Sequence, residues 1–145
     1  MDALTIFGAV AGAIDMCSKI YQSVDSVLSQ IKNAPDTARD VLSEVKVTQT
    51  TLKSFHDILE RKPVIPKSAS SRLSVGALAD VVEDCVRTLD VLRETVKTLS
   101  DPDQGRLPLY ERFQWAMNEK KVSKQLERLH RVQTCLQSMV ILCTG

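Results

Sequence analysis

The chain has 145 residues, of which 43% are hydrophobic, 26% are charged and 4% are aromatic, and its formal net charge is +1. A single domain of about 150 residues can bury a hydrophobic core without disulfides or metals. The low aromatic content, with only five Gly and five Pro, disfavours a β-sheet protein, and the near-neutral charge disfavours nucleic-acid binding.

The chain opens with an apolar segment, residues 3–14, that only Thr5 interrupts. It is shorter than the roughly 20 residues that a membrane-spanning helix needs. No Lys or Arg precedes it and Asp2 is acidic, so we expect no secretory signal. Gly8 and Gly12 lie four residues apart, on one face of a helix, a spacing that lets a second backbone approach closely. The segment is therefore either a buried core helix or a helix kept ready for another environment.

Apolar residues recur at intervals of three and four along the first half of the chain, which is typical of packed helices. The first predicted helix covers about residues 3–32, with its core positions at Phe7, Val10, Ile14, Cys17, Tyr21, Val24, Leu28 and Ile31. Asn33-Ala34-Pro35 breaks this pattern, because Pro disfavours a helical conformation in the residue before it and favours the first turn of a new helix. The second predicted helix covers about 35–61, with core positions at Ala38, Val41, Val45, Thr48, Leu52, Phe55 and Leu59.

The second half of the chain repeats this organisation after a segment rich in Pro, Lys and Ser, residues 62–73, which we expect to be a mobile loop. The third predicted helix covers about 74–99, with core positions at Val75, Leu78, Val82, Cys85, Leu89, Leu92, Val96 and Leu99. The fourth helical region covers about 108–143 and is predicted to break near Asn118; its later core positions are Val122, Leu126, Leu129, Val132, Leu136, Met139 and Cys143. The sequence thus predicts an all-α protein, an antiparallel four-helix bundle that forms one domain over residues 1–145.

Residues suited to catalysis or metal binding are sparse and scattered. His56 stands beside Asp57, but neighbouring residues on a helix point about 100° apart, so we interpret His56 as a residue at the edge of the core. His130 and Cys135 are five residues apart and do not share a face, which argues against a metal pair. Nucleotide-binding, metalloprotease and serine-hydrolase motifs are absent. The sequence predicts no enzyme, no cofactor and no metal, with cysteines serving as small core residues in a reducing compartment.

Positive charge is concentrated at the end of the chain, where residues 106–145 hold seven Lys or Arg against three Asp or Glu. A basic face is expected on the last helix, formed by Lys120, Lys121, Lys124, Arg128 and Arg131. Two interpretations stay open. The face is either an ordinary solvated surface or a contact for anionic lipid, to which each basic residue contributes about 1 kcal/mol.

Several segments resemble the N-terminal helical domain of fungal STAND and ankyrin-repeat proteins, in the HeLo-like group. They are MDALTIFGAVAGAIDM at the start, NAPDTARDVLSEV in the second helix, and LYERFQWAMNEKKVSKQLERLH with CLQSMVIL near the end. The resemblance implies a fold of helices and an effector in regulated cell death, whose N-terminal helix is released on activation and inserts into the plasma membrane. It implies that residues 3–14 are the membrane-active or oligomerising segment, and that Trp115 is an internal anchor.

We name the membrane and oligomerisation residues on that basis as Leu4, Ile6, Phe7, Gly8, Val10, Gly12 and Ile14. Asp15 and Lys19 limit the apolar run to about twelve residues, so insertion would need oligomerisation, tilting or a position within the membrane interface.

The sequence therefore predicts a cytoplasmic, non-enzymatic effector of heterokaryon incompatibility or programmed cell death, which relocates to the plasma membrane on activation. Its expected partners are further copies of itself, anionic membrane lipid and other domains of the same pathway, and no nucleic acid. One alternative is an interaction module without membrane activity. Another is an enzyme or ligand-binding bundle, which would require a deep pocket lined by His56, His130 or cysteine thiolates.

Overall fold

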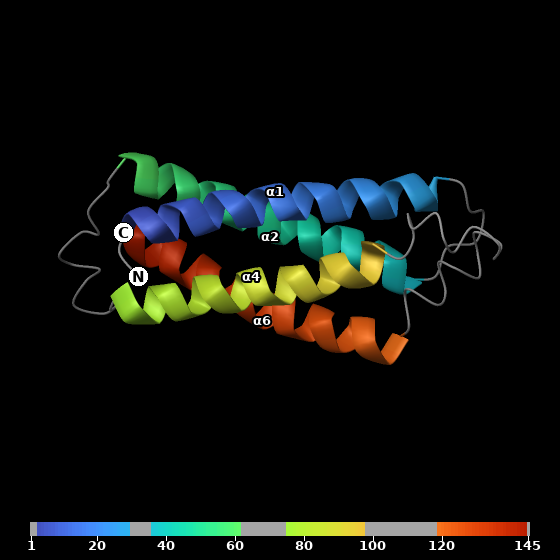
Figure 1. Ribbon diagram of the computed structural model, residues 1–145. Coiled ribbons are helices and arrows are strands. Elements are labelled where there is room, and N and C mark those ends of the chain that lie inside the picture. The colour runs from blue at the N-terminus through green and yellow to red at the C-terminus, as the bar shows by residue number, and fades with distance from the viewer. Residues whose placement is uncertain (1–2, 30–35, 62–74, 98–118, 145) are drawn as a thin grey trace.

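The computed structural model describes residues 3–29, 36–61, 75–97 and 119–144. These residues form four helices: α1 (Ala3–Leu28), α2 (Asp36–Arg61), α4 (Val75–Lys97) and α6 (Glu119–Thr144). They pack as a four-helix bundle in which helices that follow one another in the chain run in opposite directions (Figure 1). The neighbours α1 and α4 run parallel, as do α2 and α6. The predicted fold class is therefore confirmed. The predicted loop 62–73, the predicted helical stretch 108–118 with its break near Asn118, and the proposed anchor Trp115 lie outside the described residues.

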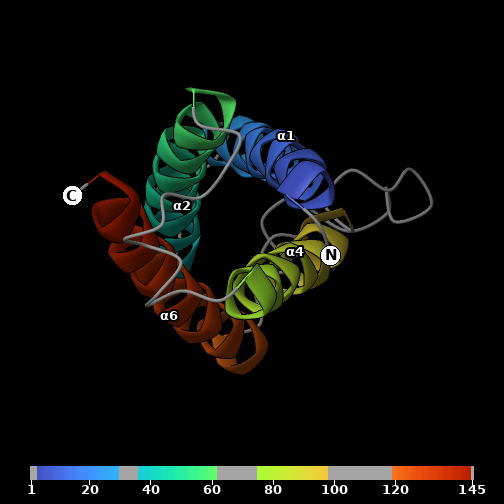
Figure 2. The ribbon, with the colours of Figure 1, turned by 90° about the vertical axis from the view of Figure 1, so that its left-hand side faces the viewer.

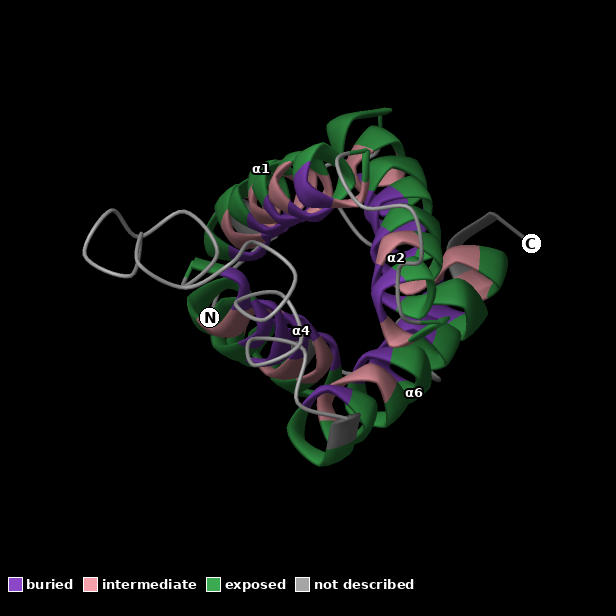
Figure 3. Ribbon diagram, turned by 90° about the vertical axis from the view of Figure 1, so that its right-hand side faces the viewer, coloured by how far each residue is buried: buried purple, intermediate pink, exposed green. Residues whose placement is uncertain are grey.

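Each helix packs against two neighbours around a square. The pairs in contact are α1 with α2, α2 with α6, α6 with α4, and α4 with α1. The view along the bundle axis shows α1 diagonally opposite α6 (Figure 2). Buried residues line the inner side of every helix, and the outer sides are exposed (Figure 3). A helix with two neighbours needs an apolar face wider than the narrow a/d seam of a coiled coil.

The core positions predicted for the second helix are confirmed, because all seven are at most 7% exposed. For α4 the six predicted positions whose side chains are described are confirmed at 3% exposure or less: Leu78, Val82, Cys85, Leu89, Leu92 and Val96. The predicted position Leu99 lies outside the described residues, as does the side chain of Val75. In α6 the predicted positions from Val122 to Met139 are buried, except that Leu126 is half-buried.

The predicted core seam of α1 is wrong at every second position. Val10, Cys17 and Val24 are buried as predicted, but the other buried apolar positions are Ile6, Ala13, Ile20 and Val27. The predicted residues Phe7, Ile14, Tyr21 and Leu28 are only half-buried and pack against the edge of the core. Each is the second member of an adjacent apolar pair. Both members repeat with the same period, and the position of the neighbouring helices decides which one faces the centre.

The end of α1 also differs from the prediction. The helix ends at Leu28 and Ser29 lies in a turn, whereas the apolar repeat predicts a helix to about residue 32. The backbone N–H of Ser29 donates to the carbonyl of Asp25 at 3.0 Å, and its hydroxyl donates to the carbonyl of Ser26 at 2.8 Å. The backbone bond has the ordinary helical spacing of four residues. The hydroxyl bond occupies the Ser26 carbonyl, which a continuing helix would use, and so it favours an end here.

Candidate functional site

The first four turns of α1 carry the residues predicted to contact membrane or a second copy, and the bundle divides them between two environments. Ile6 and Val10 are buried at 1% and 0% exposure, and Phe7 and Ile14 are half-buried. The side chain of Leu4 lies outside the described residues. Gly8 and Gly12 lie on the exposed side of the helix. Ile6 and Val10 are therefore core residues in this state of the bundle, Phe7 and Ile14 lie at the edge of the core, and the glycines lie outside it.

The two glycines make no close contact with the described helices. A Cβ atom added to Gly8 or Gly12 would meet no described atom within 4 Å. The expectation that they let α1 lie tightly against a neighbour in the bundle is therefore wrong for the described helices. A helix-interior glycine costs about 1 kcal/mol relative to alanine. This surface, formed by Gly8, Gly12 and the exposed Ala11, is called the glycine face below.

We expect the double replacement Gly8→Ala and Gly12→Ala to raise the free energy of unfolding by about 1 kcal/mol per site. The new methyl groups meet open space, so only the gain in helix propensity remains. Thermal unfolding followed by circular dichroism should show a melting temperature higher by about 4–8 °C. Ala11→Gly, on the same exposed surface, is the matched control and should lower stability by about 1 kcal/mol. If the double variant were less stable than the wild type, the added methyl groups would be meeting other atoms, which would contradict the conclusion that both positions face open space.

The buried polar side chain of Gln49, on α2, forms hydrogen bonds to α1 where the apolar segment of α1 ends. The amide nitrogen of Gln49, which is 8% exposed, donates to the carbonyl of Ile14 at 3.3 Å and to the hydroxyl of Ser18 at 2.6 Å. Buried polar groups need such partners, and a single well-bonded one helps to set the register between two helices. Just beyond, Asp15 and Lys19 form an exposed ion pair at 3.0 Å.

The aromatic ring of Phe7 makes a second specific contact between α1 and α2. It stacks on the imidazole of His56 with ring centroids 4.3 Å apart and an interplanar angle of 26°. Further along the same side, the Lys46 ammonium lies 5.5 Å from the centre of the Tyr21 ring, within reach of a cation–π interaction. Phe7 and Tyr21 therefore lie on the side of α1 that meets α2.

The predicted basic face is present on α6, but it is far from the start of α1. Lys120, Lys121, Lys124, Arg128 and Arg131 are all exposed. Because α1 and α6 run in opposite directions, their first turns lie at opposite ends of the bundle (Figure 1), and the two helices are diagonally opposed (Figure 2). The bundle therefore does not join the apolar segment and the basic face into one surface.

Two surface grooves run beside α6, and acidic residues accompany its arginines there. A groove of about 650 Å³ between α2 and α6 is lined by Asp40, Ser43, Glu44, Ser123, Leu126, Glu127, His130 and Arg131. Within it, His130 Nδ1 lies 3.3 Å from Glu44 Oε1. A second groove, of about 460 Å³ between α4 and α6, brings Arg128 and Arg131 together with Asp80 and Asp84. Part of the basic face thus has carboxylates as neighbours, which reduces its positive potential.

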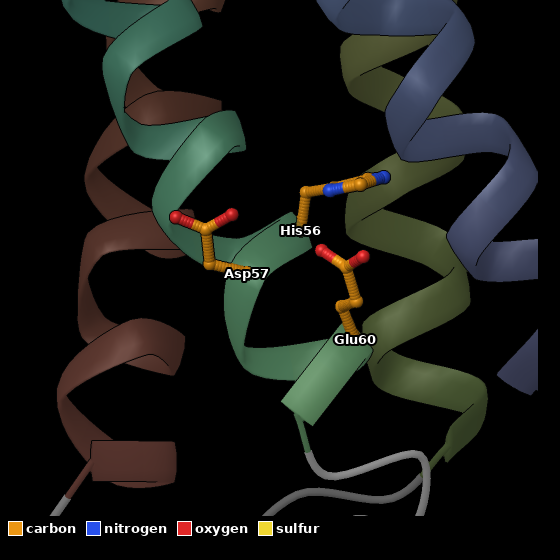
Figure 4. Close-up of side chains that lie close together, drawn as sticks. All are labelled: His56, Asp57 and Glu60. Atoms are coloured by element: carbon orange, nitrogen blue, oxygen red, sulfur yellow. The ribbon is translucent and has the colours of Figure 1, made fainter.

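The last turns of α2 hold a cluster that the sequence interpretation missed. His56, Asp57 and Glu60 each offer one potential ligand atom, and these three atoms lie within 4.8 Å of one another. In Figure 4 the imidazole of His56 extends toward α1, and the Glu60 carboxylate lies next to it. Our sequence interpretation weighed His56 only against its neighbour Asp57. The sequence feature that could have revealed this cluster is the spacing of four residues between His56 and Glu60, which places both side chains on one helix face.

The cysteines occupy two kinds of position. Cys17 and Cys85 are fully buried free thiols, as predicted for small core residues, and Cys135 is exposed. Burial raises the pKa of both core thiols to about 12, with a further contribution from Cys85 at Cys17 and from Asp84 at Cys85. These thiols stay protonated near neutral pH and are poor nucleophiles. The side chain of Cys143 lies outside the described residues.

None of the four described helices is long and apolar enough to cross a membrane. Comparisons with protein-family models, with curated proteins and with solved structures find no match to this chain.

Proposed function

We propose that this chain is a non-enzymatic effector module of the HeLo-like kind, which acts in fungal cell death or incompatibility through self-association and membrane engagement of α1. The observation that carries this proposal is the glycine face. Gly8 and Gly12 lie within the length of α1, away from its ends, and a Cβ atom added to either would meet no described atom within 4 Å.

Two interior glycines together cost the resting helix about 2 kcal/mol of stability relative to alanine. The packing of the described helices offers no compensating contact. A second helix can approach a face of small residues more closely than any other helix surface, and glycines four residues apart are the usual basis of such contacts. The glycine face therefore suits a contact with another copy of α1.

Membrane engagement requires a change in the position of α1. Ile6, Val10 and Ala13 are at most 1% exposed, so they reach lipid only when the first turns of α1 leave α2 and α4. Released, these turns present one apolar side and one glycine side, which suits an oligomer lying in the membrane interface. In the same proposal, Lys120, Lys121 and Lys124 contact anionic lipid separately, from the other end of the bundle.

Leakage of dye from vesicles tests the proposal. We expect the wild type to permeabilise vesicles that contain anionic lipid, and Gly8→Leu and Gly12→Leu to reduce leakage because leucine prevents close helix contact. Both positions lie on the exposed side of α1, and a Cβ atom added there meets no described atom within 4 Å, so we expect the resting bundle to accept both leucines. Gln22→Leu, at another exposed position of α1, is the matched control and should leak like the wild type. Equal leakage by all four proteins, or none by any, would exclude the membrane function.

The second candidate is an interaction module that self-associates without lipid, and the burial of Ile6 and Val10 favours it. In that case α1 stays packed, and its amides over residues 3–14 exchange hydrogen as slowly as those of α4. Gly8→Leu should then abolish self-association in sedimentation experiments, while the wild type associates and causes no leakage. Fast exchange over residues 3–14 would count against this candidate.

A further inference from the structure

The cluster at the end of α2 has the composition of a metal site. His56 and Glu60 are separated by four residues and Asp57 and Glu60 by three, so successive turns of one helix bring the three side chains together. Their potential ligand atoms lie within 4.8 Å of one another. Among the described residues, this is the one group of three or more His, Cys, Asp or Glu side chains that gathers so closely.

The side chains can close the remaining distance. Tetrahedral Zn²⁺ holds nitrogen and oxygen ligands at about 2.0–2.2 Å, which places the ligand atoms roughly 3.3 Å apart. Asp57 and Glu60 are exposed and free to change rotamer, whereas His56 is half-buried. The stacking of His56 on Phe7 fixes the plane of the imidazole, so one ligand is already oriented and the two carboxylates adjust to it (Figure 4).

We propose that His56, Asp57 and Glu60 form a binding site for a divalent transition metal ion of the Zn²⁺ class, with water completing the coordination. An imidazole nitrogen with two carboxylates suits Zn²⁺, whereas Mg²⁺ and Ca²⁺ prefer oxygen ligands alone. This site lies outside the sequence prediction, which assigned no metal to the chain.

Metal binding at this site acts on α1 through Phe7. A bound cation draws electron density from the imidazole, and the negative face of the Phe7 ring attracts the resulting positive charge. Phe7 lies between the buried residues Ile6 and Val10 on the first turns of α1. The metal ion therefore holds the start of α1 against α2, which opposes its release.

Calorimetric titration with Zn²⁺ tests the site, using protein in which Cys135 and Cys143 are replaced by Ser to remove their thiols as competing ligands. We expect one ion to bind per chain. His56→Ala and Glu60→Gln should each weaken binding by at least roughly 10-fold, since even residues that only support a metal ligand are worth roughly 10–100-fold in affinity. His130→Ala, which removes the other histidine, is the matched control and should bind as before. Mg²⁺ at millimolar concentration should not compete.

An unchanged affinity in His56→Ala, or no binding of Zn²⁺ by the parent protein, would overturn the proposal. Thermal unfolding adds a second measurement, because Zn²⁺ at about 100 times its dissociation constant should raise the melting temperature by about 5–10 °C. At the same Zn²⁺ concentration the shift in His56→Ala should be about half of this or less, because a 10-fold loss of affinity removes about half of the stabilisation. The melting temperature of His56→Ala without metal shows whether the variant folds.

The coupling to α1 is tested by hydrogen exchange. Zn²⁺ should slow the exchange of amides 5–12 several-fold in the parent protein and leave those of α6 unchanged. Phe7→Leu keeps an apolar side chain but removes the stacked ring. Because the coupling is reciprocal, this variant should bind Zn²⁺ several-fold more weakly, and at saturating Zn²⁺ it should lose the protection. Equal protection in Phe7→Leu would contradict the coupling through the ring. These measurements use no lipid, so the metal site and the proposed membrane function can fail independently.

Discussion

Replacing Phe55 with Ala should lower the free energy of unfolding by about 3–5 kcal/mol. Phe55 is 0% exposed and has the largest volume among the fully buried side chains of the described residues. It belongs to the single cluster of buried residues to which all four helices contribute. Truncation removes its transfer free energy and leaves a cavity that the surrounding helices fill only in part. A domain of this kind has a total stability of about 5–15 kcal/mol, so this one change removes a large share of it.

Urea unfolding followed by circular dichroism measures this loss. The midpoint should fall while the dependence on urea concentration stays the same, because the surface exposed on unfolding hardly changes. Val47→Ala is the matched control on the same helix. Val47 is 42% exposed, so its replacement should change stability by no more than about 0.5 kcal/mol. A Phe55→Ala variant as stable as Val47→Ala would show that residue 55 does not lie in the core.

Stability should fall steeply as the pH rises above about 9, because two thiols are buried in the core. Burial raises the pKa of Cys17 and of Cys85 from 9.0 to about 12. In the unfolded chain both thiols lose their protons near pH 9, whereas in the folded bundle they keep them until about pH 12. Between these values the unfolded state binds fewer protons, so rising pH favours unfolding. The stabilisation is fully present below pH 9 and is lost progressively up to about pH 12.

In the middle of this range the free energy of unfolding should fall by about 1.4 kcal/mol per pH unit for each thiol, and by about 2.7 kcal/mol per pH unit for the two together. Urea unfolding at several pH values between 8 and 10.5, under reducing conditions, measures the slope. Other groups also titrate at alkaline pH, so the double variant Cys17→Ala and Cys85→Ala is the necessary control. It should be less stable at pH 8, and its slope should be smaller than that of the wild type by a difference that grows through pH 9 to about 2.7 kcal/mol per pH unit near pH 10.5. Parallel slopes for the two proteins would contradict the prediction.

The core of α2 could be predicted from the sequence, and much of α1 could not. In α2 the apolar residues at intervals of three and four have few apolar competitors at adjacent positions, so one face is defined without ambiguity. In α1 nearly every position from 3 to 14 is apolar or glycine, and two faces repeat with the same period. Periodicity alone therefore selected Phe7 and Ile14, whereas the bundle buries Ile6 and Ala13.

The candidate site depended still more on tertiary contacts. The glycine spacing was visible in the sequence, but only the placement of the neighbouring helices shows that Gly8 and Gly12 face away from them. The pairing of Phe7 with His56, and the bonds from Gln49 to Ile14 and Ser18, join residues more than 30 positions apart. The function implied by the family resemblance stays a prediction.

By itself, the sequence determined the type and order of the four described helices, because apolar spacing and helix-breaking residues act within one segment. Only the tertiary structure decided how far each helix is rotated about its axis and which helices are neighbours. Local spacing defines an apolar face but not the direction in which it points, which depends on packing against two partners at once. That packing buries Ile6 and Val10 near the start of α1 and leaves its glycines exposed. It also places α6, which carries the basic face, diagonally opposite α1.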